Sequence, residues 1–218
     1  MIKIILVFLA IALGSYLLGN ISVARLLSKV IKTDITKLGS GNPGTINMAR
    51  NFGWKMGLLT LVLDMLKAII PCLSAYFIGL YVLPVFTPRT FIFVAGLSVI
   101  LGHMFPVFYK FKGGKGIACA LGVYAVAYPV TLAIFLAIGL IILLSTKIGS
   151  LASLIIVTGL SVIGIINFVH YTEIVLIAII YVLLVWAHRS NIVRLLHGKE
   201  NKVILFKKKE KTDVSEKL

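Results

Sequence analysis

The chain has 218 residues, of which 60% are hydrophobic and 13% are charged, and its formal net charge is +15. This balance excludes an average soluble domain and is typical of a polytopic membrane protein. The positive charge does not indicate a nucleic-acid partner, because the lysines and arginines gather between apolar runs and in the C-terminal tail. Basic loops on the cytoplasmic side of a membrane explain them more simply.

Six apolar runs follow one another, most of them near the 20 or so residues that cross a hydrocarbon core about 30 Å thick. They cover about residues 2–24, 56–80, 89–108, 117–145, 150–168 and 172–187. The fourth run is too long for one straight span, and Pro129 interrupts it, which a continuous helix tolerates poorly. We therefore expect two short helices there, over 116–127 and 129–145.

The positive-inside rule decides between six and seven crossings. If the basic stretch 25–55 is cytoplasmic, a single crossing at 117–145 would place the basic tail outside. Two crossings there place Lys147 and the tail inside. We predict an all-α polytopic membrane protein with seven transmembrane helices, some short or broken, with the N-terminus outside and the C-terminus cytoplasmic. Residues 1–198 would form the transmembrane domain and 199–218 a basic cytoplasmic tail.

With this topology three polar segments share the cytoplasmic face, and the first is GSGNPGTINMAR at 39–50. Its glycines let backbone N–H groups approach a ligand, and its hydroxyl and amide side chains add further donors. A plain turn would need only two or three of these residues. A structural turn stays the alternative to a ligand-binding loop in which Ser40, Asn47 and Arg50 make contacts.

The second segment is GHMFPVFYKFKGGKG at 102–116, which places two cations among glycines with no acidic neighbour. It is not a phosphate-binding Walker A loop, since no Ser or Thr follows Lys115. A backbone nest beside a helix N-terminus, assisted by Lys112 and Lys115, suits a phosphate. An ordinary positive-inside loop would explain the lysines but not the three glycines.

The third segment is HRSNIVRLLHGKE at 188–200, after the last apolar run. On a continuing helix His188, Asn191 and Arg194 recur at helical spacing and can face one side. An interfacial helix with snorkelling arginines is the alternative.

Other ionisable residues lie within or beside the apolar runs. Asp64 and Lys67 have the spacing of a self-neutralising pair on one helix, which indicates either a structural ion pair or support for an active site. His170 and Glu173 fall on the expected outer face, where we expect a solvated loop pair.

Together the three segments resemble the PlsY family, the bacterial membrane acyltransferases that acylate glycerol 3-phosphate with acyl phosphate. The resemblance covers essentially the whole chain, and the motifs keep the family's order and spacing. Departures are small: Thr45-Ile46-Asn47 stands where the family usually has Ala-Thr-Asn, and Ala68 follows Lys67 where glycine is common. They leave the role of Thr45 open.

The resemblance implies acyl transfer to the sn-1 hydroxyl, giving lysophosphatidic acid and phosphate, the first step of bacterial phospholipid synthesis in the cell (inner) membrane. It implies an active site on the cytoplasmic side. The partners would be acyl phosphate, glycerol 3-phosphate and membrane lipid, with no cofactor, metal or nucleic acid. The oligomeric state stays open, and a monomer is compatible with the sequence.

The expected site residues come from all three segments. We expect catalytic roles for Ser40, Arg50, His103, Lys115, His188 and Asn191. We expect substrate or phosphate binding by Gly41, Asn42, Asn47, Lys67, Lys112, Gly113, Gly114, Gly116 and Arg194.

The route of the proton is open at this point. No histidine here is followed by the aspartate of the His-x4-Asp pair used by many glycerolipid acyltransferases. His103, His188 or a phosphate oxygen of the donor could accept the hydroxyl proton, and we favour the donor. Ser40 as a covalent nucleophile is a further alternative. A transporter for an organic phosphate is the competing function, although no inverted repeat is visible in the sequence.

Overall fold

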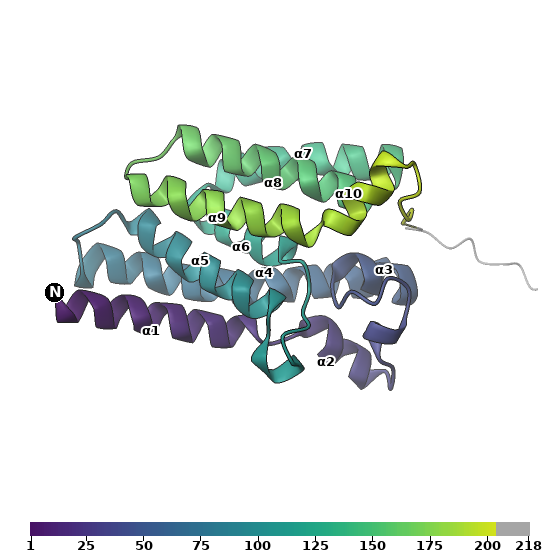
Figure 1. Ribbon diagram of the computed structural model, residues 1–218, viewed down its shortest axis with the longest axis horizontal. Helices are drawn as coiled ribbons and strands as arrows, with labels where there is room; N and C mark the ends of the chain where they lie inside the picture. The colour runs from purple at the N-terminus through teal and green to yellow at the C-terminus, as the bar shows by residue number, and fades with distance from the viewer. Residues whose placement is uncertain (204–218) are drawn as a thin grey trace, which may run out of the picture.

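The structure, a computed structural model, describes residues 1–203 and is entirely helical in its regular elements over this range (Figure 1). Seven apolar helices run along the long axis: α1 (Ile2–Gly19), α4 (Trp54–Phe77), α5 (Pro88–Met104), α6 (Ile117–Ala127), α7 (Pro129–Thr146), α8 (Gly149–Ile166) and α9 (Tyr171–Ala187). The predicted tail beyond residue 203 lies outside the described residues.

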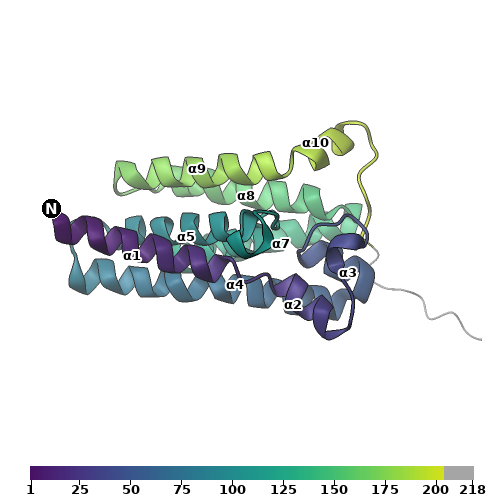
Figure 2. The same ribbon diagram turned by 60° about the horizontal axis from the view of Figure 1, so that its bottom comes forward.

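The shorter elements gather at one end of the bundle, as both views show (Figures 1 and 2). They are α2 (Val23–Val30), α3 (Thr45–Phe52), α10 (Arg189–Leu196) and the 3-10 turns η1 (Ile35–Lys37) and η3 (Val107–Tyr109). A π-helical turn, η2 (Ile78–Val82), extends α4 at the other end. The three polar segments therefore meet at one end of the molecule, as the sequence predicted.

The break at Pro129 is confirmed, because α6 ends at Ala127 and α7 begins at Pro129 with Tyr128 between them. The structure gives the number of membrane crossings only as a range. Within residues 1–203, five helices are long and apolar enough to span a membrane, or six if α9 and α10, bent by 58°, form one span. The 11 residues of α6 are too few to cross a full bilayer alone, so seven crossings stay a prediction.

Close helix packing holds the functional end together. Gly19 of α1 and Gly102 of α5 face each other, and an added Cβ at either position would overlap the backbone of the opposite helix. Small residues permit this approach, which membrane helices use in place of the hydrophobic effect. Asn20, the residue after Gly19, donates to Tyr16 O (2.6 Å) and accepts from the backbone N–H of Val107 (2.6 Å). These bonds connect the break between α1 and α2 to the segment after α5.

One expectation for the opposite end is wrong. Glu173 is fully buried and does not form a solvated pair with His170. It accepts a hydrogen bond from the Thr87 hydroxyl and another from the backbone N–H of Val169 (3.2 Å). The side chain lies on the first turn of α9, where α5 and the α8–α9 connection close over it, so burial follows from tertiary packing.

Candidate active site

A cavity of about 310 Å³ opens between α3, α6, α7, α8 and α10 at the end that holds the short helices. One part of its wall is polar and comes from all three segments singled out in the sequence: Ser40, Asn42, Thr45, Arg50, His103, Lys115, Gly116, His188, Asn191 and Arg194. Another part is aliphatic: Leu61, Leu121, Leu136, Leu140, Leu143 and Ile156. A molecule with a charged head and an acyl chain fits such a wall.

The first polar segment is held in shape by Asn47, which does not itself line the cavity. Asn47 is 1% exposed, and its amide donates to Ile35 O (3.3 Å) and Leu38 O (3.0 Å). Its Oδ1 accepts from the backbone of Ser40 (3.1 Å). The amide thus fixes the loop that presents Ser40 and Asn42, which places Asn47 behind the contact surface and not in it.

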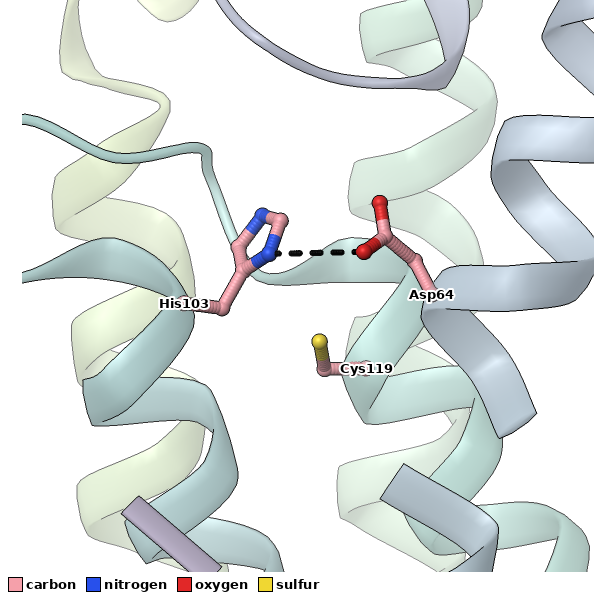
Figure 3. Close-up of side chains that lie close together, drawn as sticks. All are labelled: Asp64, His103 and Cys119. Carbon is pink, nitrogen blue, oxygen red and sulfur yellow. Dashed lines mark ion pairs between the residues drawn. The ribbon is translucent and has the colours of Figure 1, made fainter. Parts of the chain in front are cut away.

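His103, at the end of α5, belongs to a buried charged cluster with two residues of α4. Lys67 Nζ lies 2.8 Å from Asp64 Oδ1 and 2.9 Å from His103 Nδ1, and it donates to Ile21 O at 2.6 Å. Figure 3 shows the imidazole and the Asp64 carboxylate facing each other, with Nδ1 and Oδ1 3.8 Å apart. Lys67 does not line the cavity, whereas Asp64 and His103 do.

The same cluster has the residue types of a metal site, since ligand atoms of Asp64, His103 and Cys119 lie within 4.8 Å of one another (Figure 3). The Lys67 ammonium already faces the carboxylate oxygen and the imidazole nitrogen that a metal would use. A metal would have to displace this cation, so the residues present do not fit a metal centre. The Asp64–Lys67 pair predicted from the sequence is present, and it orients His103.

Lys115 precedes α6 and begins a chain of polar contacts to α10. Its ammonium donates to Asn191 Oδ1, and Asn191 donates onward to Glu200 Oε1 (2.8 Å). Glu200 Oε2 accepts from Arg194 Nε (2.9 Å). The pKa of Lys115 is lowered to about 8, mainly by burial and also by the charges of Arg194 and Arg50, while Glu200 opposes the shift.

His188 separates α9 from α10, and its ring is fixed by a backbone contact. The side chain is 3% exposed, and its Nδ1 donates to Leu184 O at 2.8 Å. A carbonyl oxygen can only accept, so Nδ1 carries the proton and Nε2 has a free lone pair. His188, Asn191 and Arg194 share the cavity, as their helical spacing predicted.

The glycines of the second segment serve a different purpose from the one expected. Gly113 N donates to Met104 O (3.1 Å) and Gly114 N donates to His103 O (3.0 Å), which folds the segment back onto the end of α5. These N–H groups are therefore not free to form a phosphate nest. Gly116, with φ of 84°, starts α6 in a left-handed conformation that glycine adopts without strain.

Lys112 and Lys115 do not share a cavity, contrary to the expectation that they hold one phosphate together. Lys112 is exposed and lines a separate groove with Gly41 and Gly113. The turn at Gly113 and Gly114 separates the two lysines, because its backbone bonds to α5 let the chain reverse between them.

Four buried polar atoms of cavity-lining residues have no hydrogen-bond partner among residues 1–203. One is Asp64 Oδ1, which is instead ion-paired with the Lys67 ammonium at 2.8 Å. The other three belong to donor groups, Thr45 Oγ1, Arg50 Nε and Ser150 Oγ, and Ser150 is 8% exposed. Buried polar groups in folded proteins are nearly always satisfied, so unpaired donors that face one cavity indicate a polar ligand.

Comparison with known proteins identifies the chain. Residues 9–198 match the family described as glycerol-3-phosphate acyltransferase. The chain belongs to this family. A glycerol-3-phosphate acyltransferase of Mycoplasmopsis pulmonis (strain UAB CTIP) is 38% identical over 224 residues, with 95% of this chain and 98% of the relative covered. Another, of Finegoldia magna (strain ATCC 29328 / DSM 20472 / WAL 2508), is 41% identical and covers 86% of this chain and 92% of its own.

Two solved structures have a similar fold. The glycerol 3-phosphate form of PlsY (YgiH), an integral membrane glycerol 3-phosphate acyltransferase, superposes with a TM-score of 0.81 at 34% identity and covers 90% of this chain and 96% of its own. The lysophosphatidic acid form gives a TM-score of 0.78 at 33% identity, with 91% and 96% covered. The protein is thus an integral membrane acyltransferase, and the organic-phosphate transporter is set aside.

The sequence missed five polar residues that line the cavity of this acyltransferase: Thr45, Ser150, Ser153, Glu200 and Asn201. Thr45 and Glu200 lie inside recognised motifs but had no assigned role, and Glu200 is only 5% exposed at its side chain. Ser150 lies outside every motif, at the start of α8. Only packing brings it to the cavity, where Gly149 lies against the side chain of Ile46 in α3.

Proposed function

We propose that the enzyme transfers an acyl group from acyl phosphate to the sn-1 hydroxyl of glycerol 3-phosphate, forming lysophosphatidic acid and phosphate. The observation that carries this proposal is the cavity itself, in which cations and unpaired donors adjoin an aliphatic wall. Both substrates carry phosphate, and one of them carries a fatty acyl chain. PlsY in its glycerol 3-phosphate and lysophosphatidic acid forms has the same fold, which supports both molecules as ligands of this cavity.

We assign two phosphate-binding regions within the cavity. Thr45, Arg50 and Ser150 present donors without protein partners, so they suit the phosphate of the acyl donor, which must be held as it leaves. Lys115, Asn191 and Arg194 form the other group, joined through Glu200. We assign them to glycerol 3-phosphate.

The chemistry needs orientation and charge stabilisation. The sn-1 oxygen attacks the carbonyl carbon of the acyl phosphate, a C–O ester bond forms, and the C–O bond to phosphate breaks with its electron pair leaving on phosphate. Fixed cations and N–H or O–H donors stabilise the negative charge on the carbonyl and phosphate oxygens. Arg50 and Lys115 are the cations of the cavity that we assign to this task.

The hydrogen bonds of the two histidines favour different roles. His103 Nδ1 accepts from the Lys67 ammonium, so its proton is on Nε2 and the ring acts as a donor. His188 has the opposite tautomer, since its Nδ1 donates to Leu184 O and leaves Nε2 as an acceptor. We infer that His188 Nε2 takes the proton of the attacking hydroxyl, although the sequence favoured a phosphate oxygen of the donor.

Replacement of His188 tests this assignment. We expect His188→Asn to lower kcat by about 10²–10⁴-fold, the usual contribution of a general base, with little change in the affinity for glycerol 3-phosphate. His103→Asn is the matched comparison. It should lower kcat but keep the loss of activity at acidic pH, which we assign to protonation of His188. A near wild-type kcat in His188→Asn would show that a phosphate oxygen of the acyl phosphate accepts the proton.

We also propose that seven segments cross the membrane, with the cavity on the cytoplasmic side. Lys147 supports this placement, because its carbonyl accepts from the backbone of Val203 (2.7 Å) and so ties the α7–α8 turn to the end of the described chain. The cations of α2, α3 and α10 lie at the same end, whereas Lys3 and Arg89 lie at the other. Cysteine labelling from each side of sealed vesicles at position 3 and position 199 would test the orientation.

The donor is tested with purified protein in detergent. Radiolabelled glycerol 3-phosphate and palmitoyl phosphate should give lysophosphatidic acid, whereas palmitoyl-CoA should not replace the donor. Lys115→Ala serves as the matched inactive protein, since it should lose activity far more than it loses stability. Product formed equally well from palmitoyl-CoA would overturn the acyl phosphate assignment, and no product from either donor would overturn the reaction.

A further inference from the structure

A second groove, of about 530 Å³, lies beside the catalytic cavity and shares no lining residue with it. Three cations line it, Arg25 of α2 and Lys110 and Lys112 of the segment after α5. Its other lining residues are neutral: Thr36, Gly41, Pro43, Phe108, Tyr109 and Gly113. A groove that concentrates positive charge without a lining carboxylate attracts an anion.

Arg25 is held in this groove with a donor to spare. Its Nη2 donates to Lys112 O at 2.8 Å, and its guanidinium lies 4.7 Å from the centre of the Tyr109 ring. Its Nε is buried and has no hydrogen-bond partner in the part of the chain that the structure describes. An orientation fixed on both sides together with an unsatisfied donor is the arrangement expected at an anion site.

The turn between Phe105 and Gly113 exposes apolar side chains beside these cations. Phe108 is 70% exposed and Phe111 is 59% exposed. Lys110 and Phe111 both have positive φ, 53° and 59°, a conformation that non-glycine residues rarely adopt. The backbone thus reverses sharply and leaves aromatic rings next to basic side chains.

The position of this turn decides what the anion is. α5 ends at Met104 and α1 ends at Gly19, and the candidate membrane spans that contain them continue to Tyr109 and Val30, so the groove lies at the same end of two apolar spans. In Figure 1 the turn after α5 lies beside the start of α2, in agreement with the contact between Arg25 and Lys112. Exposed aromatic and basic residues at this level suit the interface between acyl chains and headgroups.

The geometry points to a binding site for the phosphate headgroup of an anionic membrane lipid, formed by Arg25, Lys110 and Lys112. The phosphate lies against the three cations, and Phe108 and Phe111 contact the acyl chains below it. The site is separate from the substrate cavity, and the two are joined through the segment 112–116 and through the loop 39–44. There Ser40 and Asn42 line the cavity, while Gly41 and Pro43 line the groove.

Native mass spectrometry of the full chain, delipidated in detergent and then offered phosphatidylglycerol or phosphatidylcholine, tests the proposal. Wild-type protein should retain one phosphatidylglycerol in preference to phosphatidylcholine. The double variant Lys110→Gln/Lys112→Gln should weaken this retention by about thirtyfold, since each basic residue near an anionic lipid is worth about fivefold. Both lysines are exposed, so the fold should be unaffected.

The matched control removes the same charge nearby. Lys29 and Lys32 are exposed, line neither cavity, and include a lysine with positive φ, Lys32 at 55°. Lys29→Gln/Lys32→Gln should retain the lipid as wild type does. Equal losses in both double variants would show diffuse surface attraction and overturn the site. Displacement of the lipid by millimolar inorganic phosphate or glycerol 3-phosphate would reassign the groove to a soluble phosphate.

Discussion

Two groups of polar and charged residues lie at the same cavity and differ in how fully their members satisfy each other. Lys67 places its ammonium among Asp64, His103 and the carbonyl of Ile21. In the second group Arg50 keeps an unpaired Nε, and the hydroxyls of Thr45 and Ser150 also lack partners within the described chain. The first group is closed and can position a neighbour, whereas the second is open and can bind a ligand. Burial alone does not distinguish support from binding, but the partners of each group do: Asp64 Oδ1 accepts no hydrogen bond from the described residues, yet it is paired with the Lys67 ammonium at 2.8 Å.

Substitutions in the closed group should have their largest effect on the stability of the protein. Lys67→Met leaves Asp64 buried without its cation, which should lower the free energy of unfolding by about 3–5 kcal/mol. Denaturant unfolding in detergent measures the change. The double variant Asp64→Asn/Lys67→Met should recover much of the loss, because it leaves no unpaired charge. A single variant as stable as wild type would contradict the closed cluster.

Substitutions in the open group should have their largest effect on enzymatic activity. Arg50→Ala should lower kcat/KM by about a thousandfold, since it removes a charged donor from the phosphate region. Its unfolding free energy should change by less than about 1 kcal/mol. Arg189→Ala is the control, because this arginine is exposed and stacks on Trp186 outside the cavity (4.2 Å). Equal activity of the two variants would contradict the claim that the open group binds the substrate phosphate.

The pH dependence of Lys115 gives a finer test. Because its pKa is lowered to about 8, the ammonium is charged below this pH and neutral above it. KM for glycerol 3-phosphate should therefore rise about tenfold between pH 7 and pH 9, as expected for loss of one proton. Lys115→Arg should flatten this rise, since arginine stays protonated. An unchanged rise in the arginine variant would assign the titration to another group.

Glu200 should have the smallest effect. Its carboxylate raises the pKa of Lys115 and opposes the burial that lowers it, so Glu200→Gln should move the alkaline rise in KM to lower pH. Loss of the contact with Arg194, which is 35% exposed, should raise KM at pH 7 by only about threefold. A shift to higher pH would show that Glu200 does not act on Lys115.

Much of this arrangement could be predicted from the sequence. The apolar runs predicted the seven apolar helices, Pro129 predicted the α6–α7 break, and the helical spacing of His188, Asn191 and Arg194 placed them on one cavity. These features depend on local periodicity and on proline chemistry, which short stretches of sequence carry.

The remaining features depend on contacts between distant segments. The N–H groups of Gly113 and Gly114 are taken by carbonyls of α5, so Lys112 and Lys115 face different cavities. Ser150 reaches the cavity at the point where its neighbour Gly149, the first residue of α8, lies against the side chain of Ile46 in α3. No local pattern encodes these pairings, since each depends on which helices become neighbours.

The central claim is that the unpaired donors on the cavity wall hold a substrate phosphate. The most direct test compares kcat/KM for palmitoyl phosphate in Thr45→Val/Ser150→Ala and in Ser98→Ala, a buried serine that donates to Val94 O at 2.8 Å within α5. The cavity variant should lose about a hundredfold or more, since hydrogen bonds to charged groups are worth about 1.5–3 kcal/mol each. The Ser98 control should stay near wild type. Equal rates in the two variants would contradict the account.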